Sequence, residues 1–538
     1  MENLKNILWL CLAGLLLAAL PAAAGQIVVS TPSFALVLDA PVGGELRYLY
    51  YGTGLSEDDL RQMNVVGTCH HVAYPSYGIG WPGESALRVR HADGVIATRL
   101  YVQDVEVRQE PDAMLTLVKL KDCVYPFYVN LCYKAYRDVD VIETWAEFSH
   151  SEKTPVTLLQ FASSYLPLRR GDVWLSSLYG GWGNEARLLQ EPLKPGIRLI
   201  KNIDGVRNSH TAHAEVMFSL DGKPQENTGR TIGAALCYTG DYRLKINTDD
   251  GDYHHFFAGM DEEGASFRLK KGEVFRTPPL ALTYSEEGLG GASRNFHKWG
   301  RKHKLANGDK PRKILLNSWE GVYFDINQKD MEQMMADIAL MGGELFVMDD
   351  GWFGDKHPRD IDNAGLGDWV VNPKKLPDGI AGLLRDAAKH NIGFGIWIEP
   401  EMINTRSELY EKHPDWVLKA SERDVVLGRG GTQVVLDLAN PAVQDFVFGV
   451  VDNLMTSYPE IDYIKWDANM SVQNHGSQYL TKDNQSHMYI EFHRGFEKIC
   501  QRIRAKYPDL TIQACASGGG RANYGVLPYF DEFWVSDN

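Results

Sequence analysis

The C-terminal half of the sequence repeats one pattern, in which a short apolar run leads into carboxylates, tryptophan or lysine. A single aspartate after such a run is usually a helix cap or a turn residue. Seven successive runs carry these side chains, however, and capping does not explain so many. They end in Trp319-Glu320, Asp349-Asp-Gly-Trp352, Trp397-Ile-Glu-Pro-Glu401, Asp437, Lys465-Trp-Asp467, Cys515-Ala-Ser-Gly-Gly-Gly-Arg521 and Trp534-Val-Ser-Asp-Asn538.

This set of side chains suits a sugar-binding site. An indole packs its face against the apolar C–H face of a pyranose, while aspartate and lysine hydrogen-bond the ring hydroxyls. A few polar groups of this kind fix the orientation of a ligand in an otherwise apolar cleft. If the runs converge in space, the sequence favours carbohydrate chemistry.

The runs are expected to be β-strands that alternate with amphipathic helices. Strand, helix and strand repeated in this order indicate a parallel sheet, and seven such units predict a (β/α)8 barrel. Catalytic residues of such barrels lie at the C-terminal ends of the strands, where the polar side chains fall here. The expected strands are Ile314–Trp319, Leu345–Asp349, Phe394–Glu399, Val434–Asp437, Tyr463–Asp467, Thr511–Ala516 and Phe533–Asp537, and the expected helices include Lys329–Met341, Ile380–His390, Pro441–Ser457 and His487–Tyr507.

An eighth strand is needed to close the barrel, because an open edge leaves backbone N–H and C=O groups unpaired. The sequence ends at Asn538, directly after the seventh expected strand. We therefore expect the sequence to be truncated at its C-terminal end, and the 538-residue chain to fold poorly by itself. The alternative is an unusual barrel of seven strands, or one completed by a partner.

The N-terminal half has a hydrophobic period of two instead. The segments 114–121 and 139–148 alternate in this way, and Gly, Pro, Asn and Asp separate such runs. This pattern predicts a large antiparallel β-sandwich over residues 26–284. Residues 285–310 are predicted to form a helical linker, and residues 311–538 the catalytic barrel.

The first 24 residues have the pattern of a secretory signal peptide. Lys5 precedes an apolar run from Ile7 to Leu20, which Pro21 and three alanines follow. A charged start, a short apolar run and small residues at its end are typical of a cleaved signal. An uncleaved anchor is the alternative, but the run is shorter than the ~20 residues that span a membrane. We expect export to the periplasm or the extracellular space, and no membrane contact after cleavage.

Charge and cysteine content exclude other classes of function. The net charge is −15 and no long Lys/Arg run occurs, which argues against a nucleic-acid partner. Six cysteines would remain after signal cleavage, without a CxxC pair, and no HExxH motif occurs, so we expect no metal and no other cofactor. The glycines Gly518–Gly520 do not fit the G-x-G-x-x-G fingerprint of a nucleotide-binding enzyme.

Eight segments carry a more specific signal. They are Asn317-Ser-Trp-Glu320, Asp349-Asp-Gly-Trp-Phe-Gly354, Gly367-Asp-Trp369, Pro377-Asp-Gly379, Trp397-Ile-Glu-Pro-Glu-Met402, Lys465-Trp-Asp467, Cys515-Ala-Ser-Gly-Gly-Gly-Arg521 and Trp534-Val-Ser-Asp537. In type and order they resemble the motifs of glycoside hydrolase family 36, the bacterial α-galactosidases. The resemblance implies an N-terminal β-supersandwich followed by a (β/α)8 TIM barrel, which here lacks its last strand and helix.

The resemblance also implies a retaining mechanism with two carboxyl groups. Asp467 would be the nucleophile, and Asp537 the general acid/base. Retention requires one ionised and one protonated carboxyl about 5–5.5 Å apart. Lys465 lies two residues before Asp467 on the same strand face and would keep the nucleophile ionised, whereas acidic neighbours would raise the pKa of Asp537. The alternative for Lys465 and Asp467 is a structural ion pair inside the barrel.

The family pattern assigns further residues to the sugar. Asp349 and Asp350 would hold the axial O4 and O6, and Cys515 and Gly518 would lie near O2; a helix cap with a surface charge is the alternative for the two aspartates. The remaining expected sugar-binding residues are Trp319, Trp397, Arg429, Lys465, Asn469 and Trp534, and barrel packing is the alternative for the first two tryptophans.

Three positions depart from the family pattern. The family usually places an arginine where this sequence has Gly431, two residues after Arg429, and an aspartate where it has Asn538. The segment 77–81 differs from the usual Gly-x-Gly-Asp, which leaves open whether the sandwich contributes to the pocket.

Other functions stay open at this point. An α-N-acetylgalactosaminidase and a galactosyl-transferring transglycosylase share the chemistry, but an acetamido group needs room where Cys515 would contact O2. A non-catalytic carbohydrate-binding protein or an inactive fragment is the alternative outside catalysis. The expected partner is a small oligosaccharide of the melibiose or raffinose type. Members of the family are often tetramers, so a homo-oligomer is compatible with the resemblance.

Overall fold

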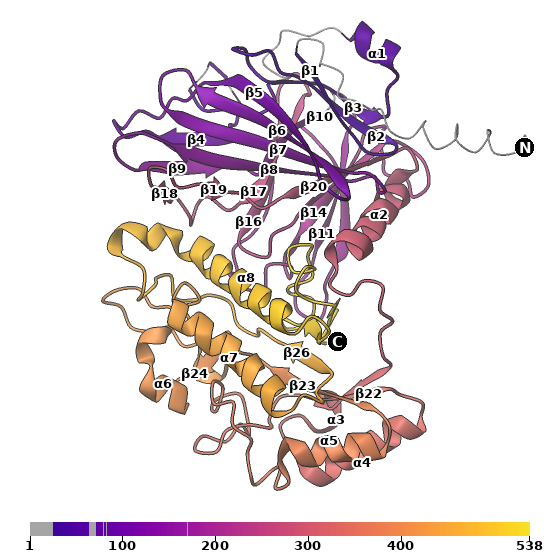
Figure 1. Cartoon of the computed structure of the whole chain (residues 1–538), viewed down its shortest axis with the longest axis vertical. Coiled ribbons are helices and arrows are strands. Elements are labelled where there is room, and N and C mark those ends of the chain that lie inside the picture. The colour runs from indigo at the N-terminus through magenta and orange to yellow at the C-terminus, as the bar shows by residue number, and fades with distance from the viewer. Residues whose placement is uncertain (1–24, 64–71, 79, 82, 169) are drawn as a thin grey trace, which may run out of the picture.

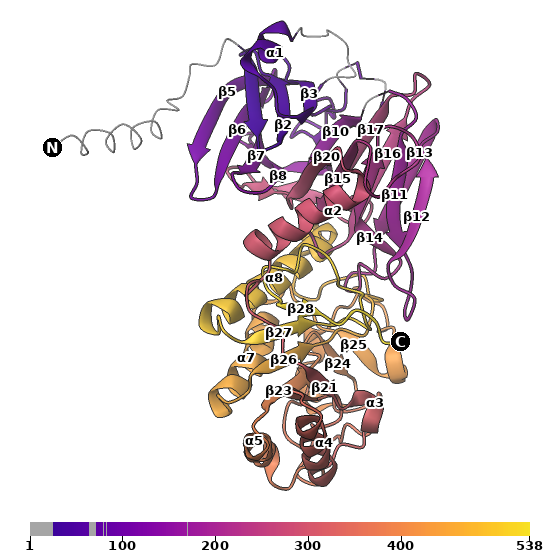
Figure 2. The same cartoon turned by 90° about the vertical axis from the view of Figure 1, so that its right-hand side faces the viewer.

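A computed structural model describes residues 25–63, 72–78, 80–81, 83–168 and 170–538 of the chain. The predicted signal peptide, residues 1–24, lies outside the described residues. Two parts are stacked end to end (Figures 1 and 2); the first is built mostly of β-strands, and the second has a sheet covered by helices. Within the described ranges, no helix has the length and apolar character that crossing a membrane requires.

The first part is an antiparallel β-sandwich, as the period of two predicted. Its largest sheet has ten strands in the order β12-β11-β14-β15-β20-β8-β7-β6-β5, with β19 beside β8. Smaller sheets have the orders β10-β17-β16-β13, β1-β2-β3 and β18-β9-β4. Apolar side chains from all of these sheets form one core, and the alternating segment 114–121 lies in β6.

The elements of this part have the following bounds: β1 Gln26–Ser30, β2 Phe34–Asp39, β3 Arg47–Thr53, α1 Glu57–Gln62, β4 Leu87–Arg90, β5 Leu100–Gln109, β6 Ala113–Asp122, β7 Phe127–Tyr136, β8 Ile142–His150, β9 Val156–Phe161, β10 Ser164–Leu168, β11 Trp174–Tyr179, β12 Arg187–Pro192, β13 Gly196–Asn202, β14 Ala212–Ser219, β15 Thr231–Leu236, β16 Tyr242–Thr248, β17 His254–Met260, β18 Phe267–Leu269, β19 Phe275–Arg276 and β20 Leu280–Ser285.

A helix connects the two parts. It comprises α2 (Gly288–Trp299) and one π-helical turn, η2 (Gly300–Lys304). Trp299 is fully buried, and its ring contacts Phe296 of the same helix and Tyr524 of the second part. The segment predicted as a helical linker therefore packs against both parts of the molecule.

The second part is built around a curled parallel sheet of six strands within the described residues, in the order β21-β22-β23-β26-β27-β28. Its strands are β21 Leu315–Asn317, β22 Leu345–Met348, β23 Gly393–Ile398, β26 Tyr463–Trp466, β27 Thr511–Ala514 and β28 Glu532–Phe533. Its main helices are α4 Gln328–Leu340, α5 Gly379–Lys389, α7 Pro441–Ser457 and α8 Met488–Lys506, close to the predicted bounds. Shorter elements are α3 Trp319–Val322, α6 Glu408–Lys412, η3 Pro414–Trp416, η4 Arg429–Gly431 and η5 Lys482–His487.

The prediction of a fourth barrel strand at Val434–Asp437 is wrong. This segment overlaps β25 (Gln433–Val435), which pairs antiparallel with β24 (Met402–Asn404), while β23 pairs directly with β26. The amide of Leu418 donates to Val435, so a second neighbouring segment also binds this backbone. The apolar run did predict burial, but apolar content cannot reveal which strand is the partner.

Loops of the sandwich support the loop that follows β27. The amide of Ser209 donates to the carbonyl of Gly520 at 2.8 Å, and His210 Nε2 lies 2.6 Å from the carbonyl oxygen of Ser517. The Asn523 side chain donates to Ser209 Oγ at 3.2 Å. The two parts are therefore joined where the sheet presents its C-terminal strand ends.

Two helix glycines provide a matched test of this packing. A Cβ on Gly495 of α8 would lie 1.9 Å from the carbonyl oxygen of Leu438, whereas a Cβ on Gly449 of α7 would meet nothing within 4 Å. We expect Gly495→Ala to lower the free energy of unfolding by at least about 1–3 kcal/mol through overpacking. Gly449→Ala should raise it by about 0.5–1 kcal/mol through backbone entropy and helix propensity. Urea denaturation measures both, and equal stability of the two variants would contradict the close approach of α8.

Candidate active site

A cavity of about 340 Å³ opens at the C-terminal ends of the parallel strands. Every residue that the sequence assigned to catalysis or sugar binding lines it except Cys515 and Gly518. The segments that follow β21, β22, β26 and β28 supply most of these side chains, while Trp397 lies on β23 and Lys465 on β26. The lining residues are Trp319, Glu320, Asp349, Asp350, Trp397, Arg429, Lys465, Asp467, Asn469, Trp534, Ser536, Asp537 and Asn538.

Asp467 follows β26 and is held by donors on both of its oxygens. Oδ2 accepts from Trp397 Nε1 at 3.1 Å and from Asn469 Nδ2 at 2.8 Å, and Oδ1 accepts from the amide of Ala468 at 2.8 Å. Burial raises the pKa of Asp467, but the Lys465 charge and the side-chain hydrogen bonds outweigh it, so the net pKa is lowered. Asp467 is therefore ionised at neutral pH, as a nucleophile must be.

Lys465 makes its direct ion pair with a different carboxylate. Its Nζ donates to Asp349 Oδ2 at 2.8 Å and lies 4.5 Å from the ring centroid of Trp534. Burial lowers the pKa of Lys465, but Asp349 and Asp467 raise it further, so the ammonium keeps its charge. The alternative of a structural ion pair between Lys465 and Asp467 is thus not what the structure contains, although the lysine charge does favour the ionised form of Asp467.

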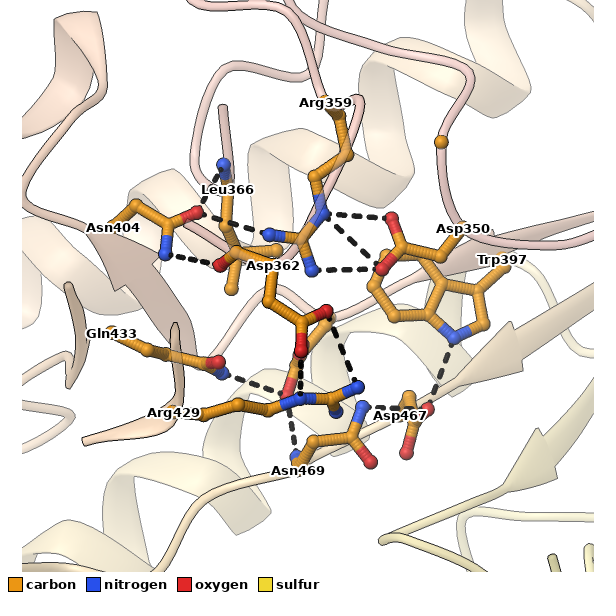
Figure 3. Close-up of polar contacts among 12 residues, drawn as sticks. Asp350, Arg359, Asp362, Leu366, Trp397, Asn404, Arg429, Gln433, Asp467 and Asn469 are labelled. Atoms are coloured by element: carbon orange, nitrogen blue, oxygen red, sulfur yellow. Dashed lines mark hydrogen bonds and ion pairs between the residues drawn. The ribbon is translucent and has the colours of Figure 1, made fainter. Parts of the chain in front are cut away.

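Asp349 and Asp350 are buried, which excludes the alternative of a helix cap with a surface charge. Asp349 Oδ2 also accepts from Asn317 Nδ2 at 2.6 Å. Asp350 forms a two-point ion pair with Arg359, whose Nε and Nη2 donate at 3.0 and 2.8 Å (Figure 3). Arg359 in turn donates to Asn404 at 3.1 Å. Neither Arg359, in a loop, nor Asn404, at the end of β24, was predicted, because neither lies in a distinguishing sequence pattern.

Arg429 lines the cavity even though the family usually places its arginine at position 431. Its Nε donates to Asp362 Oδ2 at 3.0 Å (Figure 3), and this aspartate was not predicted either. Gly431 has a φ of +68°, in the left-handed region that a residue with a side chain rarely adopts. The backbone of η4 therefore favours glycine at position 431, and the guanidinium that lines the cavity belongs to Arg429.

Glu399 is fully buried and contacts Asn469, which in turn binds Asp467. Its Oε1 accepts from the amide of Asn469 and, at 3.1 Å, from Gln433 Nε2, while Oε2 has no hydrogen-bond partner among the described residues. Burial, with the charge of Asp467, raises the pKa of Glu399 to about 8. Glu399 is therefore neutral at neutral pH and supports Asn469, which holds Asp467.

Asp537 differs from Asp467 in its surroundings. Its two oxygens accept from indoles, Oδ1 from Trp534 Nε1 at 3.1 Å and Oδ2 from Trp182 Nε1 at 2.9 Å. Burial raises the pKa of Asp537, the Trp182 hydrogen bond opposes that rise, and the Asp467 charge adds to it, so the net pKa is raised. Asp537 thus has the shift that a general acid needs.

The sandwich reaches the cavity through loop 180–186, after β11. Besides the contact of Trp182, Glu185 accepts a hydrogen bond from Ser536 Oγ at 2.8 Å. The described residues of segment 77–81 do not line the cavity, and Trp81 donates instead to the carbonyl of Glu84. The sandwich therefore contributes to the site through loop 180–186, a segment for which the sequence predicted no role.

Cys515 and Gly518 support the two aspartates from behind the cavity wall. The buried thiol of Cys515 hydrogen-bonds Asp467 and helps to lower its pKa. Gly518 has a φ of +79°, and a Cβ there would lie 2.5 Å from Glu185 Oε1. Their expected place near the sugar O2 stays a prediction. Within the described ranges, no three His, Cys, Asp or Glu side chains are grouped so that they could hold a metal ion.

A parallel sheet whose strand ends surround one sugar-sized cavity, with one ionised and one protonation-prone aspartate, is the arrangement of a glycoside hydrolase. Sequence profiles identify the family. The profile described as Melibiase matches residues 274–538, and that of the glycosyl hydrolase family 36 N-terminal domain matches residues 44–270. The chain belongs to glycoside hydrolase family 36.

Curated relatives carry α-galactosidase names. The probable α-galactosidase C of Aspergillus flavus is 34% identical over 490 residues, which cover 86% of this chain and 63% of the relative. The α-galactosidase AgaA of Geobacillus stearothermophilus is 33% identical over 435 residues, 80% of this chain and 58% of the relative. The chain thus spans less than two thirds of the length of these relatives.

Solved structures of the family have the same fold. AgaA from Geobacillus stearothermophilus superimposes with a TM-score of 0.90 at 28% identity, over 95% of this chain and 75% of AgaA. The α-galactosidase from Lactobacillus brevis gives a TM-score of 0.89 at 28% identity, over 95% of this chain and 72% of that chain. Variants of AgaA have been solved in complex with stachyose and with raffinose.

The buried Glu399 yields a prediction on stability. Its pKa rises from 4.5 to about 8 on folding, so folding takes up a proton between these values, and stability is lost as pH rises through about 8. Glu399→Gln resembles the neutral acid and should remove this loss, which melting temperatures from pH 5 to 9 would reveal. A melting temperature with the same pH dependence in both proteins would contradict a neutral Glu399.

The same substitution tests whether Glu399 supports Asp467 through Asn469. Glu399→Gln keeps an acceptor for the Asn469 amide and should keep kcat/KM within about threefold of wild type at pH 6. Glu399→Ala removes that acceptor and should lower kcat/KM at least about tenfold, as an unsatisfied buried amide costs about 1–3 kcal/mol.

Proposed function

We propose that this chain hydrolyses terminal α-D-galactosyl residues of oligosaccharides with retention of configuration. The observation that carries the proposal is that Asp467 and Asp537 line one cavity and have pKa values shifted in opposite directions. A retaining glycosidase needs this division between an ionised nucleophile and a protonated acid. The α-galactosidase names of its relatives, and the raffinose and stachyose complexes of AgaA variants, support galactosides as the substrate class.

The first step forms a covalent intermediate. The Asp467 carboxylate attacks the anomeric carbon from the β face, and the bond to the leaving oxygen breaks. Asp537 gives its proton to that oxygen, so the leaving sugar departs with a neutral hydroxyl group. The product is a β-galactosyl ester of Asp467, with Asp537 now ionised.

The second step reverses the roles of acid and base. Asp537 takes a proton from water, which attacks the anomeric carbon from the face that the leaving group vacated. The ester bond to Asp467 breaks, and α-galactose is released with both carboxyl groups in their starting states. Lys465 favours departure of Asp467 as a carboxylate, since its charge stabilises the ionised form.

Recognition of galactose depends on the buried aspartates. We propose that Asp349 and Asp350 accept hydrogen bonds from the axial O4–H and the O6–H. Lys465 and Arg359 already bind these two carboxylates and fix their direction. Rigid acceptors that fit an axial hydroxyl discriminate against glucose, whose equatorial O4 points elsewhere.

Two further proposals concern the protein as a whole. The apolar run and alanines of residues 1–24 support export to the periplasm or the extracellular space. Assembly into a homo-oligomer, and the absence of membrane contact after signal cleavage, remain predictions.

Chemical rescue tests the nucleophile. Asp467→Gly should lose at least about 10⁴-fold in kcat/KM on an aryl α-galactoside, and azide should restore turnover by occupying the vacated site. The expected product is β-galactosyl azide, identified by NMR. Asp355→Gly, at an exposed position outside the cavity, is the matched control and should need no azide. A folded Asp467→Gly protein that azide does not rescue would count against the assignment.

The pH profile tests the acid. Activity requires Asp467 ionised and Asp537 protonated, so kcat/KM should fall at low pH through the lowered pKa and at high pH through the raised one. Asp537→Asn should abolish the basic limb and lower kcat/KM on raffinose by about 10²–10⁴-fold. Its loss should be smaller on a dinitrophenyl galactoside, whose leaving group needs little protonation. An unchanged basic limb in Asp537→Asn would assign the acid to another group.

A further inference from the structure

We propose that Ser517 is a positioning residue that fixes the side-chain amide of Asn469, so that its NH2 group, and not its carbonyl oxygen, faces Asp467. The inference rests on the proposed function and adds to it a device that keeps Asp467 in its reactive, ionised form. Ser517 does not line the cavity, so its effect on the reaction must pass through the residues that it binds.

Asn469 lies between Ser517 and Asp467 and uses both ends of its amide. Its Oδ1 accepts from the Ser517 hydroxyl at 2.8 Å and from the Ser517 backbone N–H at 3.1 Å. Its Nδ2 donates to Asp467 Oδ2 at 2.8 Å. The Ser517 N–H also reaches Asp467 Oδ1, but at a longer distance of 3.4 Å. Most of the influence of Ser517 on Asp467 therefore passes through the Asn469 amide.

Groups that can only donate determine which way this amide faces. The backbone N–H of Ser517 cannot accept a hydrogen bond, so a flipped Asn469 would place its NH2 group against another donor. The Ser517 hydroxyl is directed in the same sense, because Arg207 Nη1 donates to its oxygen at 3.5 Å and favours an O–H that points to Asn469. The two donors of Ser517 thus hold Oδ1 on their own side and the NH2 group on the side of Asp467.

The orientation of the amide is coupled to the charge of Asp467. The observed orientation gives the ionised carboxylate a donor, and this hydrogen bond helps to lower the pKa of Asp467. The flipped orientation would bring Oδ1 against Asp467 Oδ2, and two acceptors can make this contact only if Asp467 is protonated. A protonated Asp467 is no longer a nucleophile. By holding the amide, Ser517 favours the state of Asp467 that attacks.

The backbone conformation of Ser517 indicates that its hydroxyl matters. Its φ is +49°, in the left-handed region that serine rarely adopts. Such strain persists only where the surroundings compensate for it, and here the carbonyl oxygen of this buried residue lies 2.6 Å from His210 Nε2. Glycine would adopt the same conformation without strain. The backbone alone therefore does not account for a serine at this position, whereas its bond to Asn469 does.

Two substitutions separate the hydroxyl from the backbone conformation. Ser517→Ala and Ser517→Gly both remove the hydroxyl, but only glycine adopts the left-handed conformation freely, so Ser517→Gly should have the higher Tm. We expect the two variants to lose activity equally, with kcat/KM on a dinitrophenyl α-galactoside lowered about three- to tenfold. This substrate needs little protonation of its leaving group, so its rate reports on Asp467.

The pH profile supplies a readout that a merely structural role would not move. The Asn469 hydrogen bond lowers the pKa of Asp467, so an amide that is no longer held should let this pKa rise. The acidic limb of kcat/KM should therefore shift to higher pH by at least about 0.5 unit in both Ser517 variants. Ser219→Ala is the matched control, because it removes a buried hydroxyl that has no hydrogen-bond partner among the described residues. Its profile should equal that of the wild type.

A double-mutant cycle shows whether Ser517 acts through Asn469. Asn469→Ala removes the amide and should by itself lower kcat/KM at least about tenfold and shift the acidic limb in the same direction. Once the amide is absent, adding Ser517→Ala should change kcat/KM by less than about twofold, because the two side chains no longer share an interaction.

An acidic limb that stays at its wild-type position in both Ser517 variants would overturn the inference, as would an equal effect of Ser517→Ala with and without the Asn469 amide. A purely structural role predicts that activity follows Tm, so that Ser517→Gly resembles the wild type and only Ser517→Ala is impaired. Failure of the proposed function has a different signature, because the wild-type protein would then release no galactose from the dinitrophenyl substrate.

Discussion

The buried ammonium of Lys465 is the charge on which the arrangement of the cavity depends. It donates to Asp349 at 2.8 Å, lies over the ring of Trp534 and lowers the pKa of Asp467. A buried ammonium is tolerated only where paired charges and acceptors surround it. Strands β22 and β26 must therefore end in fixed register with β23, whose Trp397 lies opposite Lys465. Without the lysine, the neighbouring buried carboxylates of Asp349 and Asp467 would favour protonation of Asp467.

The need to pair buried charges also explains which carboxyl groups of the site are neutral. Three buried or half-buried carboxylates around the cavity each bind an arginine, and these pairs are Asp350–Arg359, Asp362–Arg429 and Glu401–Arg521. Glu399 has no cation bound to it within the described residues and becomes neutral instead. Among the described residues, the side chain of Asp537 receives hydrogen bonds from two indoles and has a raised pKa, whereas the nearby Lys465 ammonium lowers the pKa of Asp467. The opposite pKa shifts of the two aspartates thus follow from where positive charge is placed.

The sequence predicts the part of the site that lies on regular elements. Lys465, Asp467 and Trp397 follow apolar strands, and the ends of parallel strands meet at one edge, so their convergence could be predicted. The pairing of the segment Val434–Asp437 could not be predicted, because an apolar run indicates that a segment is buried but not which strand it pairs with. Arg359 and Trp182 were missed for a related reason. Each reaches the site from a loop, and only the tertiary fold brings loops that are distant in sequence together.

The sandwich is accordingly part of the site and not a separate module. Its loops hold the backbone of Ser517 and Gly520, just after the Cys515 thiol that helps to lower the pKa of Asp467, and its loop 180–186 binds Asp537. Strand β28 comprises only two residues, so few backbone hydrogen bonds fix the segment that carries Asp537. Side-chain contacts from the sandwich supply the missing restraint. Asp537 is therefore positioned by the packing of two domains, whereas Asp467 is positioned by the sheet.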